Sequence, residues 1–303
     1  MLIGGQWDEQ ATDTRGRGGS FDRTAATFRD RITADGSSGL AAEAGRYQLY
    51  LSFGCPWCHR VMIFLKLKKL ERIISVSYVN HTLTQGGWSF REPDPLTGAR
   101  FLYEVYLRAV PNFTGRCTVP LLWDTRTGTI VNNESSEIIR MLNREFAAFT
   151  DDRADYYPPE LAPEIDAVNE RIYHNVNNGA YRCGFATAQQ PYEQAARGLF
   201  ETLDWIEATL TRQEHLVGER QTEADWRLFP TLVRFDCAYY PLFKCNLRHL
   251  YEYPAMWRYT KHLYAVPGIA DTVDVQVYKE NYYSIRSVNP SGVVPLGPRI
   301  EFR

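Results

Sequence analysis

A short strand that leads straight into a cysteine and a helix is the feature that most limits how this chain can fold. Residues 47–51 show the alternation of a strand, and residues 56–70 repeat apolar side chains with the period of a helix. Cys55 lies at the junction, and Pro56 follows at a position that the first turn of a helix tolerates. Unpaired N–H groups and the helix dipole favour a thiolate there, so we expect the pKa of Cys55 to lie below its usual value of about 8.5. The stretch predicts a nucleophilic or redox-active thiol.

Cys58 completes a C-x-x-C pair with Cys55, and this pair has other interpretations. Both can be small buried side chains, which is common for cysteine outside disulfides. The letters CPWCH (55–59) also match the attachment motif of c-type haem, but residues 1–40 lack the basic start and apolar core of an export signal. A zinc site would need a second Cys or His pair, whereas the other cysteines stand apart: Cys117, Cys183, Cys237 and Cys245. Thiol chemistry is favoured, and the buried alternative stays open.

The length, composition and net charge of the chain restrict the classes of protein to which it can belong. Its 303 residues suit two domains, and a hydrophobic content of 44% is ample for packed cores. A net charge of −2 without dense Lys/Arg runs argues against a nucleic-acid partner. The apolar stretches fall short of the ~20 residues of a membrane span, which argues against a membrane partner. Six scattered cysteines and no visible signal favour a cytoplasmic location.

The chain is expected to consist of an extension and two domains. Residues 1–46 show little periodicity and are predicted to be an extended arm that packs on the body. Residues 47–150 are predicted to form an α/β domain. A polar, proline-ended segment (151–159) opens a helical domain, residues 151–303, whose tail from residue 289 is expected to run over the surface. The apolar anchors of the arm are Phe21, Phe28 and Ile32.

The α/β domain follows a thioredoxin-like plan, in which a β-α-β unit precedes a hairpin and a closing helix. The predicted strands are residues 47–51, 73–79, 118–123 and 129–131, and the predicted helices are residues 56–70, 103–107 and 135–146. In this plan a cis-proline lies beside the thiol, and Val119-Pro120 occupies the position. Only about 5–6% of X–Pro bonds in folded proteins are cis, so the residues alone leave the isomer open.

The second domain has helical periodicity almost throughout. Its predicted helices are residues 161–177, 190–210, 223–239 and 253–265. Thr222 and Asp225 form a capping box before the third of these, so this motif is expected to start a core helix and to carry no chemistry. The predicted fold class is therefore an α/β, thioredoxin-like domain followed by an all-helical domain.

Short colinear motifs along nearly the whole chain add a more specific indication. They include GCPW (54–57), GWSF (87–90), TVPLLWD (118–124), NESSEIIR (133–140), VNNG (176–179), TEAD (222–225) and FKCN (243–246). This set resembles the glutathionyl-hydroquinone reductases, the Xi class of the glutathione transferases. The resemblance implies the helical C-terminal domain of a glutathione transferase, and a homodimer formed partly through the arm and the tail.

The resemblance also implies which residues form the site. Cys55 matches the nucleophile, and the glutathione site matches Trp88, Arg116, Val119, Glu134 and Ser135. Backbone groups of Val119 can pair with the cysteinyl part of glutathione, Glu134 can accept its ammonium, and Ser135 at a helix start can bind its carboxylate. Arg116 can pair with a carboxylate of glutathione. Tyr181 and Tyr282 match the residues that hold the aromatic substrate, since a phenol can stack on a ring and hydrogen-bond its hydroxyl groups.

Each of these residues also has a structural interpretation. Glu134 and Ser135 can be a plain helix cap, Trp88 can be a core or loop aromatic residue, and any tyrosine among the 19 of this chain can be structural. Many members of the family have alanine where this chain has Cys58, which can be either a small buried residue or a thiol that resolves a mixed disulfide.

The expected activity is the glutathione-dependent reduction of glutathionyl-hydroquinones through a mixed disulfide of Cys55 and glutathione, which needs no metal or prosthetic group. Two alternatives are a glutaredoxin-like or dehydroascorbate-type reductase that uses both thiols, and a non-catalytic carrier of aromatic ligands.

Overall fold

The computed structural model describes residues 1–11, 14 and 16–302, and the chain divides into two compact units. The first unit comprises Met1–Asp13 and Thr24–Ala154, and the second comprises Thr14–Arg23 and Asp155–Arg303. The arm predicted for residues 1–46 is thus shared between the units, and its residues 14–23 belong to the helical one.

A four-stranded mixed sheet forms the centre of the first unit. Its strands are β3 (Tyr47–Leu51), β4 (Ser75–Tyr78), β5 (Leu121–Asp124) and β6 (Thr129–Asn132), in the order β4-β3-β5-β6. β3 pairs with β4 in parallel and with β5 antiparallel, and β5 pairs antiparallel with β6. All five residues of β3 are buried, as expected for a strand inside a sheet. The thioredoxin-like prediction is confirmed.

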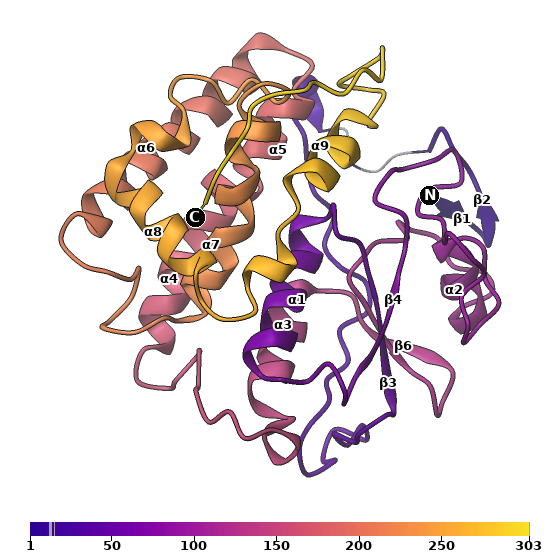
Figure 1. The fold of residues 1–303 in the computed structure, drawn as a ribbon. Helices are drawn as coiled ribbons and strands as arrows, with labels where there is room; N and C mark the ends of the chain where they lie inside the picture. Colours follow the sequence, from indigo (N-terminus) through magenta and orange to yellow (C-terminus); the bar gives the residue numbers. More distant parts are fainter. Residues whose placement is uncertain (12–13, 15, 303) are drawn as a thin grey trace. The chain divides into compact units, whose positions relative to one another are not determined.

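Three helices accompany this sheet: α1 (Pro56–Leu67), α2 (Leu102–Ala109) and α3 (Ser135–Arg144), with a short 3-10 turn at Ala147–Phe149. α1 and α3 pack against each other, as Figure 1 shows. The peptide bond between Val119 and Pro120 is cis. Because Pro120 has no N–H for the ladder, β5 begins at Leu121 and not at residue 118 as predicted.

A buried ion pair joins the start of β3 to the end of β5. Arg46 donates from Nε and Nη2 to the carboxylate of Asp124, at 3.0 and 2.7 Å. The Arg46 side chain is almost fully buried and Asp124 fully so. Burial works to raise the pKa of Asp124, but its bonds to Arg46 and Thr127 lower that pKa to about 2. The two strands are therefore held in register by a charge pair as well as by the ladder.

The arm has more regular structure than the sequence predicts. β1 (Leu2–Ile3) and β2 (Gln6–Trp7) form a hairpin whose turn residues, Gly4 and Gly5, have φ values of 53° and 83°. Only glycine adopts such angles readily, so these residues fix the turn. Further along, Phe28 exchanges backbone and side-chain hydrogen bonds with Asn133. The arm thereby reaches the residue just before the predicted glutathione-binding pair.

The second unit is helical. Its α-helices are α4 (Ala162–Ile172), α5 (Gly179–Phe185), α6 (Gln189–Leu210), α7 (Glu223–Arg234), α8 (Pro254–Tyr264) and α9 (Val275–Tyr283). π-helical turns at Tyr173–Asn177 and Phe235–Tyr239 continue α4 and α7, and 3-10 turns lie at Arg17–Gly19, Leu250–Glu252 and Ala270–Thr272. α5 and α9 are absent from the prediction, whereas the capping box of Thr222 and Asp225 at the start of α7 is confirmed.

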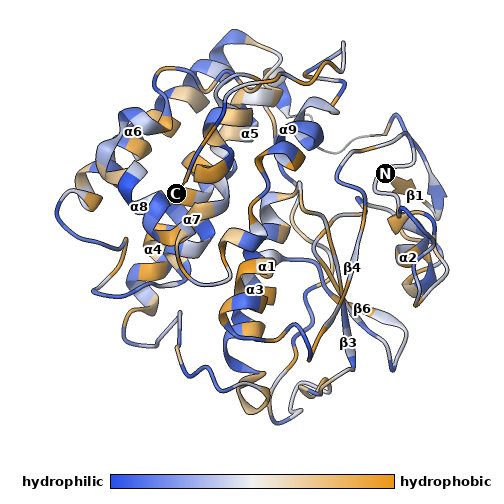
Figure 2. Ribbon diagram, in the orientation of Figure 1, coloured by the Kyte–Doolittle hydropathy of each residue, from blue (hydrophilic) through white to orange (hydrophobic). Residues whose placement is uncertain are grey.

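Hydrophobic and hydrophilic residues alternate along the helices of this unit, for example along α4, α6 and α8 (Figure 2). This pattern is that of helices with one face in a core and the other in solvent. Among the described residues, no helix combines the length and the apolar character needed to cross a bilayer.

Candidate active site

Cys55 stands where the sequence places it, at the N-terminus of α1. It is the N-cap residue, with extended backbone angles, and its carbonyl oxygen accepts the first helical bond from the amide of His59 at 3.0 Å. Its sulfur lies 3.6 Å from the carbonyl oxygen of Val119. The side chain is 7% exposed, so the sulfur sits at the edge of the packed interior.

The other cysteines have settings that do not favour a reactive thiolate. All six lie in the described part of the chain and none is in a disulfide. Cys58, one turn along α1, is fully buried. Burial raises the pKa of Cys117 and Cys237 to about 12 and that of Cys245 well above its usual value, so these three are protonated thiols at neutral pH.

Val119 offers backbone groups beside the thiol. Its carbonyl oxygen accepts a bond from the Cys55 thiol, and its amide makes no hydrogen bond within the described part of the chain. An N–H and a C=O displayed together before the first residue of β5 can pair with an extended peptide in the manner of an added strand. The cis bond to Pro120 agrees with the thioredoxin-like position predicted for it.

Tyr106 links this segment to the start of α3. Its hydroxyl donates to the carbonyl oxygen of Thr118 at 2.8 Å and accepts from the side-chain amide of Asn133 at 3.2 Å. The amide of Asn133 also reaches Thr118 Oγ1 at 3.3 Å. The residues just before Val119 and just before Glu134 are thereby held together, a role for Tyr106 and Asn133 that sequence reasoning missed. The motif NESSEIIR (133–140) could have pointed to Asn133, whereas no motif in the sequence points to Tyr106.

Glu134 is the N-cap of α3, as its structural interpretation predicts. Its Oε1 accepts from the backbone N–H of Ser136 at 3.0 Å and from the hydroxyl of that residue at 2.8 Å. Within the described residues Oε2 has no hydrogen-bond partner, so the carboxylate keeps an oxygen for a second donor.

Ser135 is buried, and its hydroxyl accepts from Arg60 Nη1 at 3.4 Å. The guanidinium of Arg60 also lies 4.6 Å from the centre of the Trp57 ring. Arg60 thus connects α1 to the first residue of α3. The N–H of Ser135, one of the unpaired donors of a helix start, makes no hydrogen bond within the described residues.

Trp88 and Arg116 are both partly exposed. Trp88 lies on the loop between β4 and α2, where its carbonyl oxygen accepts from the amide of Leu102. Arg116 follows Gly115, which pairs through its backbone with Leu2 of the arm. The structure fixes the backbone on which each side chain is carried, and their roles toward a ligand stay predictions.

The second unit brings the two predicted tyrosines together. The hydroxyls of Tyr181 on α5 and Tyr282 on α9 lie 2.8 Å apart. A third phenol, Tyr239 in the π-helical turn after α7, lies 2.7 Å from the hydroxyl of Tyr282. Tyr282 is 1% exposed and Tyr239 fully buried, whereas Tyr181 is partly exposed. These three residues, the phenol chain, therefore have one end open; Tyr239 was missed because nothing in the sequence distinguishes it from the other tyrosines.

Aromatic and cationic groups surround the open end of the phenol chain. Phe21 stacks on the Tyr181 ring with centres 6.3 Å apart, and Phe243 meets that ring edge-on at 5.4 Å. The guanidinium of Arg23 lies 4.8 Å from the ring centre, and its Nε donates to Asn178 Oδ1 at 2.9 Å. Phe21 and Arg23 belong to the arm, so the arm contributes to the surroundings of Tyr181 within this unit.

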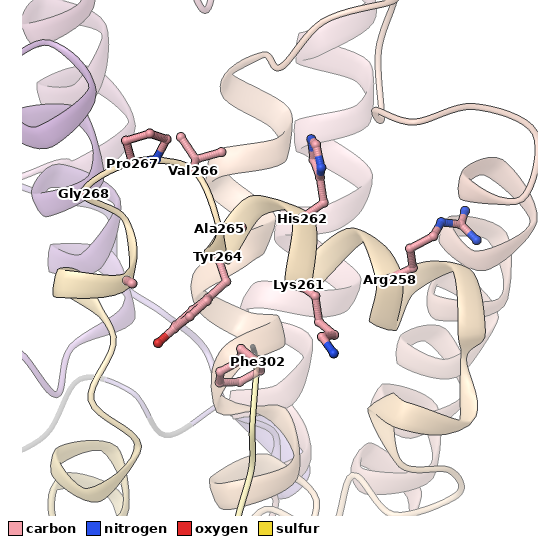
Figure 3. Close-up of a pocket in the computed structure, with 10 residues that line it drawn as sticks. Arg258, Lys261, His262, Tyr264, Ala265, Val266, Pro267, Gly268 and Phe302 are labelled. Atoms are coloured by element: carbon pink, nitrogen blue, oxygen red, sulfur yellow. The ribbon is translucent and has the colours of Figure 1, made fainter.

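A pocket of about 550 Å³ lies elsewhere, against the end of α8, and includes no predicted site residue. Figure 3 shows that its cationic side chains do not converge, because Lys261 and His262 point in opposite directions. Ligand sites place a few polar groups toward one point, so this pocket is not the candidate site. No group of three or more His, Cys, Asp or Glu side chains suited to a metal ion is found among the described residues.

Comparisons with known proteins place the chain in a family. The models of the N-terminal and C-terminal domains of glutathione S-transferases match residues 54–145 and 189–262. The glutathionyl-hydroquinone reductase PcpF of Sphingobium chlorophenolicum is 49% identical, over 98% of this chain and 96% of its own. The crystal structure of the glutathione transferase Xi of Phanerochaete chrysosporium matches with a TM-score of 0.90 and 45% identity, over 92% of this chain and 93% of that one.

This chain belongs to the Xi class of the glutathione transferase family. The glutathione-bound structure of the homologue YqjG from Escherichia coli K-12 agrees with this glutathione transferase along its whole length. The TM-score is 0.91 at 41% identity, over 100% of this chain and 97% of the other. The recognition made from the motifs and the predicted fold class are both confirmed.

Proposed function

We propose that this protein reduces glutathionyl-hydroquinones to hydroquinones and uses glutathione as the reductant. The observation that carries the proposal is the Cys55 sulfur at the start of α1, 3.6 Å from the Val119 carbonyl and beside a cis-proline. A helix N-terminus is a setting that favours a nucleophilic thiolate. Membership of the Xi class, whose relatives include a glutathionyl-hydroquinone reductase, supports the choice of substrate.

The proposed reaction has two steps, the cleavage of a thioether and a thiol–disulfide exchange. The Cys55 thiolate attacks the glutathione sulfur of the substrate and forms an S–S bond, while the bond from that sulfur to the ring carbon breaks. The electron pair of the broken bond stays with the ring, and its carbon takes up a proton, so the hydroquinone leaves. A second glutathione then attacks the glutathione sulfur of the mixed disulfide, which releases oxidised glutathione and restores Cys55.

Glutathione is proposed to bind to the first unit through backbone groups of Val119, the start of α3 and two side chains. The cysteinyl part pairs with the N–H and C=O of Val119. The γ-glutamyl carboxylate accepts from the hydroxyl and the N–H of Ser135, where the dipole of α3 favours an anion. The γ-glutamyl ammonium donates to Glu134, which keeps one oxygen for it. Trp88 and Arg116 complete the site, with Arg116 as the partner of a glutathione carboxylate.

The hydroquinone is proposed to bind to Tyr181 in the second unit. An aromatic ring can stack beside Tyr181, whose neighbours Phe21 and Phe243 are themselves aromatic. Tyr282 holds the Tyr181 hydroxyl at 2.8 Å and so orients it toward a ligand. The phenol at the open end can then hydrogen-bond a substrate hydroxyl or deliver a proton.

Full burial of Cys58 is what the one-thiol route expects, in which this residue is a small apolar side chain. We also propose a cytoplasmic location and a homodimer, as the family resemblance implies. Size-exclusion chromatography with light scattering tests the dimer.

A turnover assay tests the function. Purified protein is given a glutathionyl-hydroquinone and excess glutathione, and chromatography follows hydroquinone and oxidised glutathione. We expect both products in equal amounts from the wild type and from Cys117→Ser, the control, and neither from Cys55→Ser. Release that persists in Cys55→Ser would refute the mechanism. Reduction of small disulfides without hydroquinone release would establish the dithiol alternative in its place.

A further inference from the structure

A fully buried arginine packs against α9 one helical turn before Tyr282. Arg234 is the last residue of α7, which packs on α9, and it is 0% exposed. Its guanidinium lies 3.6 Å from the centre of the Tyr278 ring, and its Nη1 donates to the carbonyl oxygen of Pro230 at 2.9 Å. Burying a charge is costly unless neighbouring groups stabilise it, so the neighbours of this cation are informative.

Tyrosines are prominent among those neighbours. Burial works to lower the pKa of Arg234, yet that pKa is raised, and the groups that raise it include Tyr278 and all three members of the phenol chain. The effect is reciprocal. Burial raises the pKa of Tyr282 and of Tyr239 well above the usual value, and Arg234 acts in the opposite direction on both. The geometry agrees: Arg234 directly precedes the turn that carries Tyr239, and its guanidinium lies on the ring of Tyr278, one turn before Tyr282. The cation is therefore placed to stabilise negative charge on the phenol chain.

We propose that Arg234 is a positioning residue of the reaction, which stabilises the phenolate left on the phenol chain when Tyr181 gives a proton to the substrate. This inference rests on the proposed function. In the first step the Cys55 thiolate forms the S–S bond, the bond from sulfur to carbon breaks, and the ring carbon takes the proton of the Tyr181 hydroxyl. The hydrogen bonds at 2.8 and 2.7 Å allow Tyr282 and then Tyr239 to pass a proton toward Tyr181, so that the charge lies nearer to Arg234.

The second step restores the starting charges. The second glutathione loses its thiol proton to the phenolate, its sulfur attacks the mixed disulfide, and Cys55 leaves as a thiolate. One negative charge thus moves from Cys55 to the phenol chain and back, and no further oxidant or acid is consumed. Stabilisation present only while the phenolate exists lowers the barrier without tightening substrate binding.

The alternative is that Arg234 only packs against Tyr278. Arg171 provides a comparison for the loss of a cation from the face of a ring, because its guanidinium lies 4.2 Å from the centre of the Trp205 ring. Unlike Arg234 it is exposed, so Arg234→Lys serves as the comparison that keeps a buried charge. The variants to compare are Arg234→Met, Arg234→Lys and Arg171→Met. A methionine in place of a buried charge keeps much of the side-chain volume, and replacements of this kind are often tolerated by the fold.

Two reactions of the same variants separate the roles. Hydroquinone release needs protonation of a carbon, whereas glutathione-dependent reduction of a small glutathione mixed disulfide needs Cys55 alone. We expect Arg234→Met to lower kcat for hydroquinone release by about 100-fold with KM little changed, within the range found for lost acid–base assistance. Arg234→Lys should recover part of that rate, and disulfide reduction and Arg171→Met should stay near wild type.

A spectroscopic titration gives an independent readout. Tyrosinate absorbance should appear at higher pH in Arg234→Met than in wild type, and at the wild-type pH in Arg171→Met. If Arg234→Met lowers the rates of both reactions equally, or leaves the tyrosinate titration unchanged, the proposal is overturned, because a packing role predicts these results. Absence of hydroquinone release from the wild type would instead refute the proposed function, and the titration would still decide whether Arg234 favours tyrosinate.

Discussion

The phenol chain makes a prediction about stability that can be worked out from its hydrogen bonds. In Tyr282→Phe, the hydroxyl of Tyr239 loses the one hydrogen-bond partner that it has in the described structure, while the residue stays fully buried. A buried polar group without a partner costs about 1–3 kcal/mol, and the lost bond itself contributes about 1 kcal/mol. Tyr181 is partly exposed, so water can replace its partner. We therefore expect Tyr282→Phe to lower the free energy of unfolding by about 2–4 kcal/mol.

The double variant is expected to be more stable than this single one. Tyr239→Phe alone leaves Tyr282 bonded to Tyr181 and should cost about 1 kcal/mol. Tyr239→Phe/Tyr282→Phe removes both buried hydroxyls of the phenol chain, so neither is left without a partner and the free energy of unfolding should be only about 1–2 kcal/mol below wild type. The double loss is then about 2–3 kcal/mol smaller than the sum of the two single losses, and this difference is the coupling measured in a double-mutant cycle.

Calorimetry of the four proteins measures the effect, with Tyr283→Phe as the control. Tyr283 lies beside Tyr282 on α9, and its hydroxyl makes no hydrogen bond within the described residues. We expect Tm to fall by roughly 5–10 °C in Tyr282→Phe, by less in the double variant, and hardly at all in the control. A double variant whose loss equals the sum of the two single losses would refute the chain as one coupled network.

Two further predictions concern the first unit. Cys58→Ala should keep the rate of hydroquinone release within about twofold of wild type, since a buried Cys58 behaves as a small apolar side chain. Mass spectrometry of the wild type after mild alkylation should find Cys55 modified first. A large loss of turnover in Cys58→Ala would instead support the dithiol alternative. Asp124→Asn should destabilise the fold at neutral pH by about 1–3 kcal/mol, because the buried guanidinium of Arg46 loses one carboxylate and keeps only that of Glu43. The folded pKa of Asp124, about 2, lies below its ordinary value of 3.8, so its contribution is present above about pH 4 and is lost as the pH falls toward 2. The difference in urea midpoint between wild type and variant should therefore be large at pH 6 and small at pH 2.5. An equal difference at both pH values would contradict the reasoning.

The strand and helix around Cys55 could be predicted because each local signal agrees with the fold. The alternation of β3, the proline at the start of α1 and the apolar repeat of that helix all point to one structure, and the observed bounds differ by a few residues only at the helix end. The isomer of Pro120 was left open, since an X–Pro bond takes its isomer from contacts that the sequence does not display.

The tyrosines of the second unit, in contrast, could not be predicted from local sequence signals. Tyr181 and Tyr282 lie on α5 and α9, which have seven and nine residues and were both absent from the predicted helices. Apolar periodicity needs a window of about 11–18 residues, so helices this short give no clear signal. The family motifs supplied these tyrosines. Tyr239 was not found at all, because its hydroxyl gains a role only where α9 packs against the turn that carries it.

Two of the buried arginines, Arg46 and Arg234, differ in what their neighbours can do, and this difference decides which observable each should affect. Asp124 carries its charge at every pH above about 2, so it stabilises Arg46 in the resting fold. A phenol is neutral until it gives up a proton, so the interaction of Arg234 with the phenol chain strengthens only when a phenolate forms. An interaction that is stronger in the transition state than in the resting enzyme raises kcat, whereas one that is equally strong in both contributes to stability alone. Removal of the Arg46 charge should therefore be seen mainly in unfolding, and removal of the Arg234 charge mainly in turnover.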